Sequence, residues 1–207
     1  MFLKPESKVV ATDHRDYPEW HHGRQQFALW YIEITDPALL QYLHHLRQLF
    51  SEMLYQPNTR QFHITVFICG FLTQDTAHFN DDFTHAQFTQ QCAEIQRISS
   101  LKCQLKTAKI NSFESALFVE VDDTTGILKQ YRQVLAQYHH EIAALEYCPH
   151  ITLGLYREAY SAQDILQKMA QIKPQSFHFM ANQLTFGYYQ AQQLQGVLYP
   201  HTQIQLG

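Results

Sequence analysis

The sequence is poor in positive charge and contains no long apolar run. It has 15 Lys and Arg against 19 Asp and Glu, a formal net charge of −4. This balance excludes the strongly basic surface with which proteins coat nucleic acids, because such binding depends on many clustered cations. No apolar stretch approaches the ~18 residues that a membrane helix needs, and residues 1–6 lack the apolar core of a secretory signal. We therefore expect a soluble cytoplasmic protein with no membrane partner and no extended nucleic-acid surface.

Glycine, proline and cysteine are also scarce. Seven Gly and seven Pro exclude collagen-like and low-complexity chains. The four cysteines are widely spaced and form no C-x-x-C pair; they are Cys69, Cys92, Cys103 and Cys148. Without an export signal, we expect them to be free thiols in a reducing compartment.

Histidine, by contrast, is abundant. Six of the 13 histidines form doublets at 21–22, 44–45 and 139–140. Neighbouring residues on a helix point about 100° apart and cannot easily share a metal ion. No H-E-x-x-H or comparable ligand spacing is present. The doublets therefore predict exposed positions, and the sequence predicts neither a metal nor another cofactor.

The chain contains an internal repeat. At the offset of 87 residues that places the segment 63–65 on 150–152, both segments read His-Ile-Thr. The same offset, without a gap, aligns 30–36 with 117–123, with a Glu and an Asp identical in both. Two separate identities at one offset indicate a duplication.

Each copy has the hydrophobic pattern of a strand, a helix and a second strand. Bulky and β-branched residues alternate over 27–34 and 116–122, as in half-buried strands. Apolar stripes at helical spacing follow over 39–54, after the cap Asp36, and over 127–142. The other predicted elements are strands at 61–72, 103–112, 148–156, 176–187 and 195–205 and helices at 83–98 and 161–172.

This order of elements predicts an α+β fold of two lobes related by a pseudo-twofold axis. Each lobe is expected to be an antiparallel sheet with helices on its outer face, and the lobes enclose a central cleft. Residues 25–207 would form this single bilobal domain, after an irregular N-terminal segment 1–24 that contains Pro5, Pro18 and Gly23.

The repeated motif carries the chemistry. Because alternate residues of a strand share a face, His63 and Thr65 point one way, and His150 and Thr152 repeat the arrangement. Two facing imidazoles suit general acid–base catalysis near neutral pH. Two hydroxyls beside them can donate hydrogen bonds to an anionic oxygen. The set matches phosphodiester transfer without a metal or a nucleoside triphosphate.

The stretches 62–66 and 149–154 resemble the paired H-x-[TS] motifs of the 2H phosphoesterase superfamily, in particular its bacterial 2′-5′ RNA ligase and cyclic phosphodiesterase branch. The resemblance implies a bilobal fold with a water-filled groove. It implies a small nucleotide or RNA end as substrate, with hydrolysis of a 2′,3′-cyclic phosphate or reversible 2′-5′ joining of RNA.

By motif match, His63 and His150 would be the acid–base pair, and Thr65 and Thr152 would position the phosphate. Which histidine is the base stays open, because the copies are formally equivalent. The chain departs from many relatives at Leu155, where they carry a basic residue.

Other residues share the predicted face of the motifs. Phe67 and Tyr156 are candidates for contact with the substrate, by stacking or hydrogen bonding, although aromatic residues in strands more often pack. Cys69 and Cys148 have the same parity, so a Cys–His nucleophile is an alternative to be tested.

Glu33 and Glu120 match across the repeat, with an undetermined orientation. Two other functions stay open: a nucleotide-binding module that uses the same cleft without catalysis, and a metal-dependent enzyme. The sequence does not predict the oligomeric state.

Overall fold

Nine strands form one twisted sheet in the computed structural model, which describes residues 2–142 and 146–207. The strands are Gln26–Glu33 (β1), His63–Thr73 (β2), Asp82–Thr84 (β3), Cys103–Ser112 (β4), Ala116–Asp122 (β5), His150–Leu155 (β6), His178–Ala181 (β7), Gln183–Gln190 (β8) and Tyr199–Gln205 (β9). Their order is β7-β4-β5-β6-β2-β1-β8-β9, and β3 pairs with β2. All pairs are antiparallel except β2–β3.

Five helices accompany the sheet in the described part of the chain: Pro18–His21 (α1), Pro37–Leu49 (α2), His85–Ile98 (α3), Ile127–Leu135 (α4) and Ala162–Ala170 (α5). The Asp36 side chain caps α2 by accepting the Leu39 N–H at 2.8 Å. Thr84 and Gln87 form a capping box at the start of α3. These local signals fix where the helices begin.

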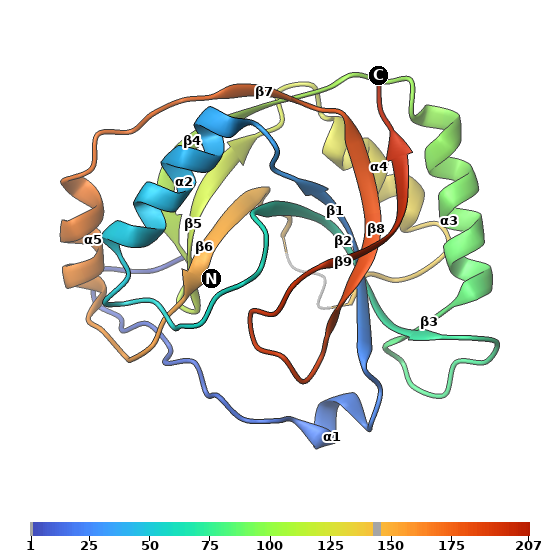
Figure 1. The fold of residues 1–207 in the computed structure, drawn as a ribbon, viewed down its shortest axis with the longest axis horizontal. Helices are drawn as coiled ribbons and strands as arrows, with labels where there is room; N and C mark the ends of the chain where they lie inside the picture. The colour runs from blue at the N-terminus through green and yellow to red at the C-terminus, as the bar shows by residue number, and fades with distance from the viewer. Residues whose placement is uncertain (1, 143–145) are drawn as a thin grey trace.

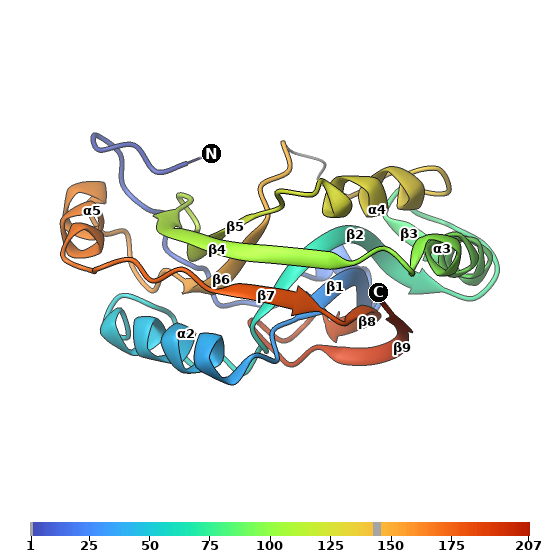
Figure 2. The same cartoon turned by 90° about the horizontal axis from the view of Figure 1, so that it is seen from above.

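The sheet has two halves of equivalent design. One half is β2-β1-β8-β9 and the other is β6-β5-β4-β7, and they meet where Ile64 of β2 lies opposite Ile151 of β6. The predicted α+β class with two similar halves is therefore confirmed. The halves share one continuous sheet, and Figures 1 and 2 show α2 and α4 on opposite sides of the molecule.

Each helix of the repeat packs against the strand with which the other half begins at the junction. α2, which follows β1, packs against β6, and α4, which follows β5, packs against β2. Arg47 of α2 donates from Nε to the Leu153 carbonyl at 2.8 Å, and Arg132 of α4 donates from Nη1 to the Val66 carbonyl at 2.7 Å. Leu153 and Val66 are equivalent positions of the repeat. The duplicated segments are thus interlocked by equivalent contacts.

Several elements differ from the sequence-based expectation. α4 ends at Leu135 instead of continuing to Ile142, whose N–H bonds to the Ile68 carbonyl of β2 at 3.1 Å. The strand expected over 176–187 is divided at Asn182. There the chain leaves its partner β4 in one half and joins β1 in the other. Helix α1 and strand β3 were not expected.

The N-terminal segment has little regular structure and runs across both halves (Figure 1). Backbone N–H groups of Leu3, Val9 and Thr12 bond to carbonyls of the second half at 2.9–3.0 Å. At its other end, Arg24 forms ion pairs with Asp81 and Asp82 at 2.6 Å. Met1 lies outside the described residues.

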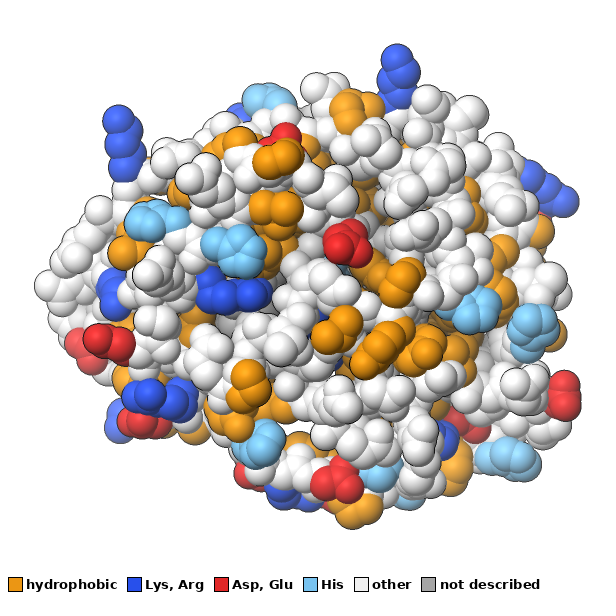
Figure 3. All heavy atoms as spheres, viewed as in Figure 1, with side chains coloured by type: hydrophobic (Ala, Val, Ile, Leu, Met, Phe, Trp, Pro, Cys, Tyr) orange, Lys and Arg blue, Asp and Glu red, His pale blue; other side chains and the backbone are white. Residues whose placement is uncertain are grey.

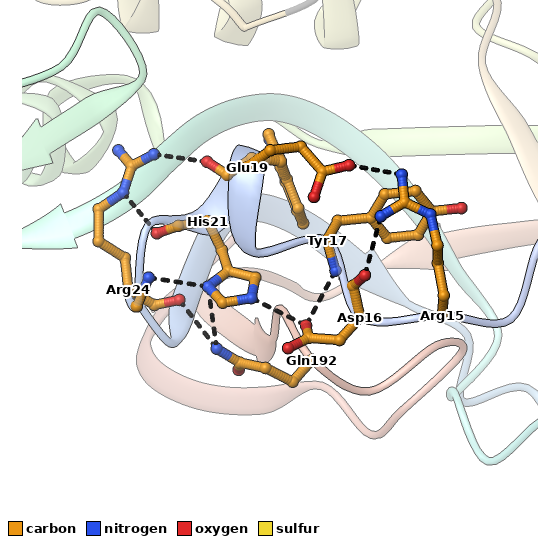
Figure 4. Close-up of polar contacts among 9 residues, drawn as sticks. Arg15, Asp16, Tyr17, Glu19, His21, Arg24 and Gln192 are labelled. Atoms are coloured by element: carbon orange, nitrogen blue, oxygen red, sulfur yellow. Dashed lines mark hydrogen bonds and ion pairs between the residues drawn. The ribbon is translucent and has the colours of Figure 1, made fainter.

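A polar network holds α1 to the β8–β9 loop (Figure 4). The His21 ring accepts the Gly23 N–H on Nδ1 at 2.9 Å, so its Nε2 donates to the Asp16 carboxylate at 2.8 Å. The Gln192 side chain donates to the Arg24 carbonyl at 3.2 Å. The buried His21 of the first doublet is therefore part of a structural network and not an exposed residue.

Candidate active site

The two H-x-T motifs lie side by side where the halves of the sheet meet. β2 and β6 are antiparallel with Ile64 opposite Ile151, so each motif histidine neighbours the motif threonine of the other strand. Both isoleucines are fully buried, whereas the four motif residues are all half-buried on the opposite face; these are His63, Thr65, His150 and Thr152. We call this side of the sheet the motif face. The structure thus brings all four predicted residues together.

Backbone carbonyls fix the tautomer of both imidazoles. Nδ1 of His63 lies 2.8 Å from the Gln61 carbonyl oxygen, and Nδ1 of His150 lies 2.7 Å from the Cys148 carbonyl oxygen. A carbonyl only accepts, so each Nδ1 carries the proton and each Nε2 of a neutral ring keeps a lone pair. Both copies therefore present the atom that a general base needs.

The surroundings hold both imidazoles neutral. The pKa of His63 is lowered to about 4, mainly by burial and to a smaller extent by the positive charges of Arg60 and of a protonated His150. Burial also lowers the pKa of His150. Both rings are consequently available as proton acceptors at neutral pH in the unliganded protein.

Aromatic rings flank the two histidines. The Tyr31 ring meets His63 edge-on with centroids 5.8 Å apart, and at the equivalent position Phe118 lies 5.0 Å from His150. Outside the repeated elements, the Phe113 ring meets His150 edge-on at 5.2 Å. The His150 side of the motif face is therefore the more aromatic one.

The expected substrate contacts of Phe67 and Tyr156 are wrong. Both side chains are buried in the core, with exposed fractions of 1% and 0%, and the Tyr156 hydroxyl is paired with Ser112 at 2.6 Å. The reason is a β-bulge after each motif. The pairing passes from Thr65–Tyr31 to Phe67–Trp30, and the equivalent step occurs in β6. One extra residue reverses the alternation that follows it.

The same bulge turns Cys69 into the core, where burial raises its thiol pKa well above the usual value. Cys148 is half-buried, and burial raises its thiol pKa as well. A nucleophilic cysteine requires a lowered pKa, so neither thiol is suited to that role.

The register also settles where the matched glutamates lie. Glu33 is opposite His63, and Glu120 is opposite His150, so each carboxylate lies on the motif face beside an imidazole. The identity at the 87-residue offset singled out these two glutamates, but the direction of their side chains could be assigned only from the strand register. Leu155 is half-buried, and its N–H bonds to the Gln195 side chain at 3.0 Å.

Arg60 is a further residue near this site, and sequence reasoning missed it. It belongs to the loop before β2, and it has no counterpart of the same type at the equivalent position, which is Tyr147. A method based on repeated residues therefore had no signal for it.

No group of three His, Cys, Asp or Glu side chains within 2–142 and 146–207 is arranged to hold a metal ion. No helix described there has the length and apolar character to cross a membrane.

A cavity of about 710 Å³ opens beside the C-terminal end of β1. Glu33, Thr185 and Gln203 are among its lining residues, but none of the four motif residues lines it.

Comparison with known proteins decides the family. A family model described as the 2′-5′ RNA ligase superfamily matches residues 35–193, which contain both motifs. The chain belongs to this superfamily. The predicted relationship to the 2H phosphoesterases is thereby confirmed. No curated protein sequence matches the chain.

Solved structures show the same fold for this superfamily member. E. coli LigT in its apo form is 14% identical, with a TM-score of 0.59 over 89% of this chain and 99% of LigT. LigT complexed with 3′-AMP gives a TM-score of 0.60 at 14% identity over the same shares. A protein described as a phosphoesterase is 13% identical, with a TM-score of 0.60 over 88% of this chain and 98% of its own.

Proposed function

We propose that this superfamily member is a metal-independent phosphodiesterase that hydrolyses 2′,3′-cyclic phosphates of nucleotides or RNA ends. One observation carries the proposal. Two imidazoles with the same carbonyl-bound Nδ1 and two threonines lie on one face of adjacent strands. This is the donor and acceptor set that an in-line displacement at phosphorus requires.

In the proposed reaction, the neutral Nε2 of one histidine removes a proton from water. The water oxygen forms a bond to phosphorus, and the bond from phosphorus to one ribose oxygen breaks. The second imidazole, protonated because the negative phosphate raises its pKa, gives its proton to that ribose oxygen. The hydroxyls of Thr65 and Thr152 donate hydrogen bonds to the non-bridging oxygens. The same displacement with the 5′-hydroxyl of an RNA in place of water would join 2′-5′ ends, because the new bond forms between that oxygen and phosphorus while the bond from phosphorus to the ribose 3′ oxygen breaks.

The surface favours a short substrate. On the face seen in Figure 3, Lys and Arg side chains stand apart from one another and do not form a basic stripe. LigT has been crystallised with 3′-AMP and with phosphate, ligands of the size that a nucleotide or an RNA end would present. We therefore propose recognition of the terminal nucleotide and not of an extended duplex.

The test is a product assay with adenosine 2′,3′-cyclic phosphate and 2′-5′-linked RNA side by side, with and without EDTA. The His63→Ala and His150→Ala variants should each lose about 10²- to 10⁴-fold in kcat/KM, the usual contribution of one acid–base group. His45→Ala, at an exposed position of α2, should retain activity. Loss of activity in EDTA, or full activity in both motif variants, would contradict the proposal.

The lowered pKa values favour a second candidate, a nucleotide-binding module without turnover. Neither ring is protonated at neutral pH before a ligand binds. A histidine can therefore act as the acid only if the bound substrate raises its pKa. Tight binding of cyclic nucleotide with no monophosphate product would establish that alternative.

A further inference from the structure

Arg60 is a half-buried cation whose guanidinium is only partly hydrogen-bonded. Its Nε donates to the Gly196 carbonyl at 2.9 Å, and its guanidinium lies 4.1 Å over the ring centre of Tyr189. Within 2–142 and 146–207, neither amino group donates a hydrogen bond and no carboxylate forms an ion pair with it. Neither amino group is a fully buried donor without a partner, so both are accessible to solvent.

Other half-buried arginines are compensated or serve the helix side of the sheet. Arg24 pairs with two aspartates, and Arg132 pairs with Glu141. Arg47 has no carboxylate partner in the described residues, but it packs over the buried ring of Phe62 and ties α2 to β6. Among these side chains, Arg60 is the one that combines free amino groups with a position beside the motifs.

The contact between Arg60 and Tyr189 places the Arg60 guanidinium on the motif face. Tyr31, whose ring meets His63, belongs to a small apolar cluster that also contains Leu198 and Tyr189 and is separate from the main core. Tyr189 therefore lies on the same side of the sheet as His63. Because the Arg60 guanidinium stacks over Tyr189, it lies on this side too. Its charge is among the causes that lower the pKa of His63.

The loop that carries Arg60 is held in place. Gln61 donates from Nε2 to the Leu198 carbonyl at 3.0 Å and accepts the Leu198 N–H at 2.9 Å. Gln195 bonds to the Leu155 N–H and to the Tyr55 carbonyl, each at 3.0 Å. The guanidinium is thus positioned before a ligand binds, which reduces the entropy lost on binding.

A partly desolvated cation without a counter-charge is unfavourable unless an anion completes it. The guanidinium fork matches the oxygens of a phosphate. We propose that Arg60 binds a second phosphate group of the substrate, next to the one that the H-x-T motifs hold. The inference rests on the proposed function and narrows its substrate class to nucleotides with a phosphate in addition to the reacting ester.

Calorimetric titration tests this without turnover. The ligands are 3′-AMP, adenosine 3′,5′-bisphosphate and the dinucleotide ApAp with a 3′-phosphate. The intact protein should bind one or both two-phosphate ligands about 10- to 100-fold more tightly than 3′-AMP, the worth of hydrogen bonds to a charged group. A gain only for the bisphosphate indicates a terminal phosphate, and a gain only for ApAp indicates an RNA end.

The Arg60→Gln variant should bind the two-phosphate ligands and 3′-AMP about equally, and the Arg60→Lys variant should keep part of the preference. Arg157→Gln, whose side chain is 52% exposed, is the matched control and should keep all of it. The proposal is overturned if the intact protein has no preference for the two-phosphate ligands, or if Arg60→Gln retains that preference.

An assay of adenosine 2′,3′-cyclic phosphate hydrolysis distinguishes failure of the Arg60 subsite from failure of the proposed phosphodiesterase activity. Hydrolysis without a two-phosphate preference contradicts the Arg60 subsite alone. A preference that disappears in Arg60→Gln, in a protein that hydrolyses nothing, contradicts the proposed catalysis alone.

Discussion

The lowered pKa of His63 makes a prediction about folding that does not depend on any substrate. The folded protein holds this ring neutral down to a pKa of about 4, against a reference value of 6.5. Between these two values the unfolded chain binds a proton that the folded protein does not. Stability contributed by the neutral buried ring is therefore present at neutral pH and is lost as the pH falls through this window.

The size of the effect follows from the two values. At pH 5, the unfolded histidine is almost fully protonated and the folded one is mostly neutral, a difference of about 2 kcal/mol in the free energy of unfolding. Near pH 7.5 this difference is close to zero. The wild-type protein should thus lose about 2 kcal/mol more than a His63→Gln variant between these two pH values.

Urea denaturation at pH 7.5 and pH 5 measures this difference, because other titrating groups change equally in both proteins and cancel. His45→Gln, on an exposed part of α2, is the control and should follow the wild type. Equal losses in the wild type and in His63→Gln would show that the ring is not desolvated as the structure has it. Saturating inorganic phosphate should reduce the difference, since an anion beside the ring favours its protonated form.

Two further predictions concern catalysis. Replacing Thr65 or Thr152 by Val removes one hydrogen-bond donor to the phosphate, and each variant should lose about 10²- to 10³-fold in kcat, as for other oxyanion donors; unchanged kcat in both would assign these side chains to packing. The charge of Arg60 disfavours protonation of His63, so we expect His63 to be the base and His150 the acid. A nucleotide ester with a 4-nitrophenolate leaving group needs no acid, so His150→Ala should recover activity on it and His63→Ala should not; the reverse pattern would exchange the roles.

Local patterning was sufficient to locate most elements and the motif itself. The expected bounds of β4 and β5 agree with Cys103–Ser112 and Ala116–Asp122, although irregularities interrupt the pairing of β4 with β5 and of β5 with β6. The juxtaposition of the motifs followed from the repeat. An offset shared by two strands implies equivalent positions, and equivalent strands at a pseudo-twofold axis are neighbours.

Orientation beyond the motifs could not be predicted. Strict alternation assigns Phe67 and Tyr156 to the face of the histidines, but a bulge depends on how many residues of one strand oppose the partner strand. That count is a property of the pairing and has no signature in a single strand. Gly154 is the one local hint, since a Cβ there would come within 3.2 Å of the Leu54 side chain, as expected for a position turned into the core.

The repeat explains the symmetric part of the site, and the segments outside it explain the asymmetry. Equivalent carbonyls hold both Nδ1 atoms, and equivalent rings of Tyr31 and Phe118 flank both imidazoles. The cation Arg60 and the ring of Phe113, however, belong to connecting loops and have no counterparts of their own type. A duplicated strand–helix–strand unit would therefore give two identical histidines, whereas acid–base catalysis needs one ring to donate and one to accept. The loops, which the repeat does not constrain, are where that difference arises.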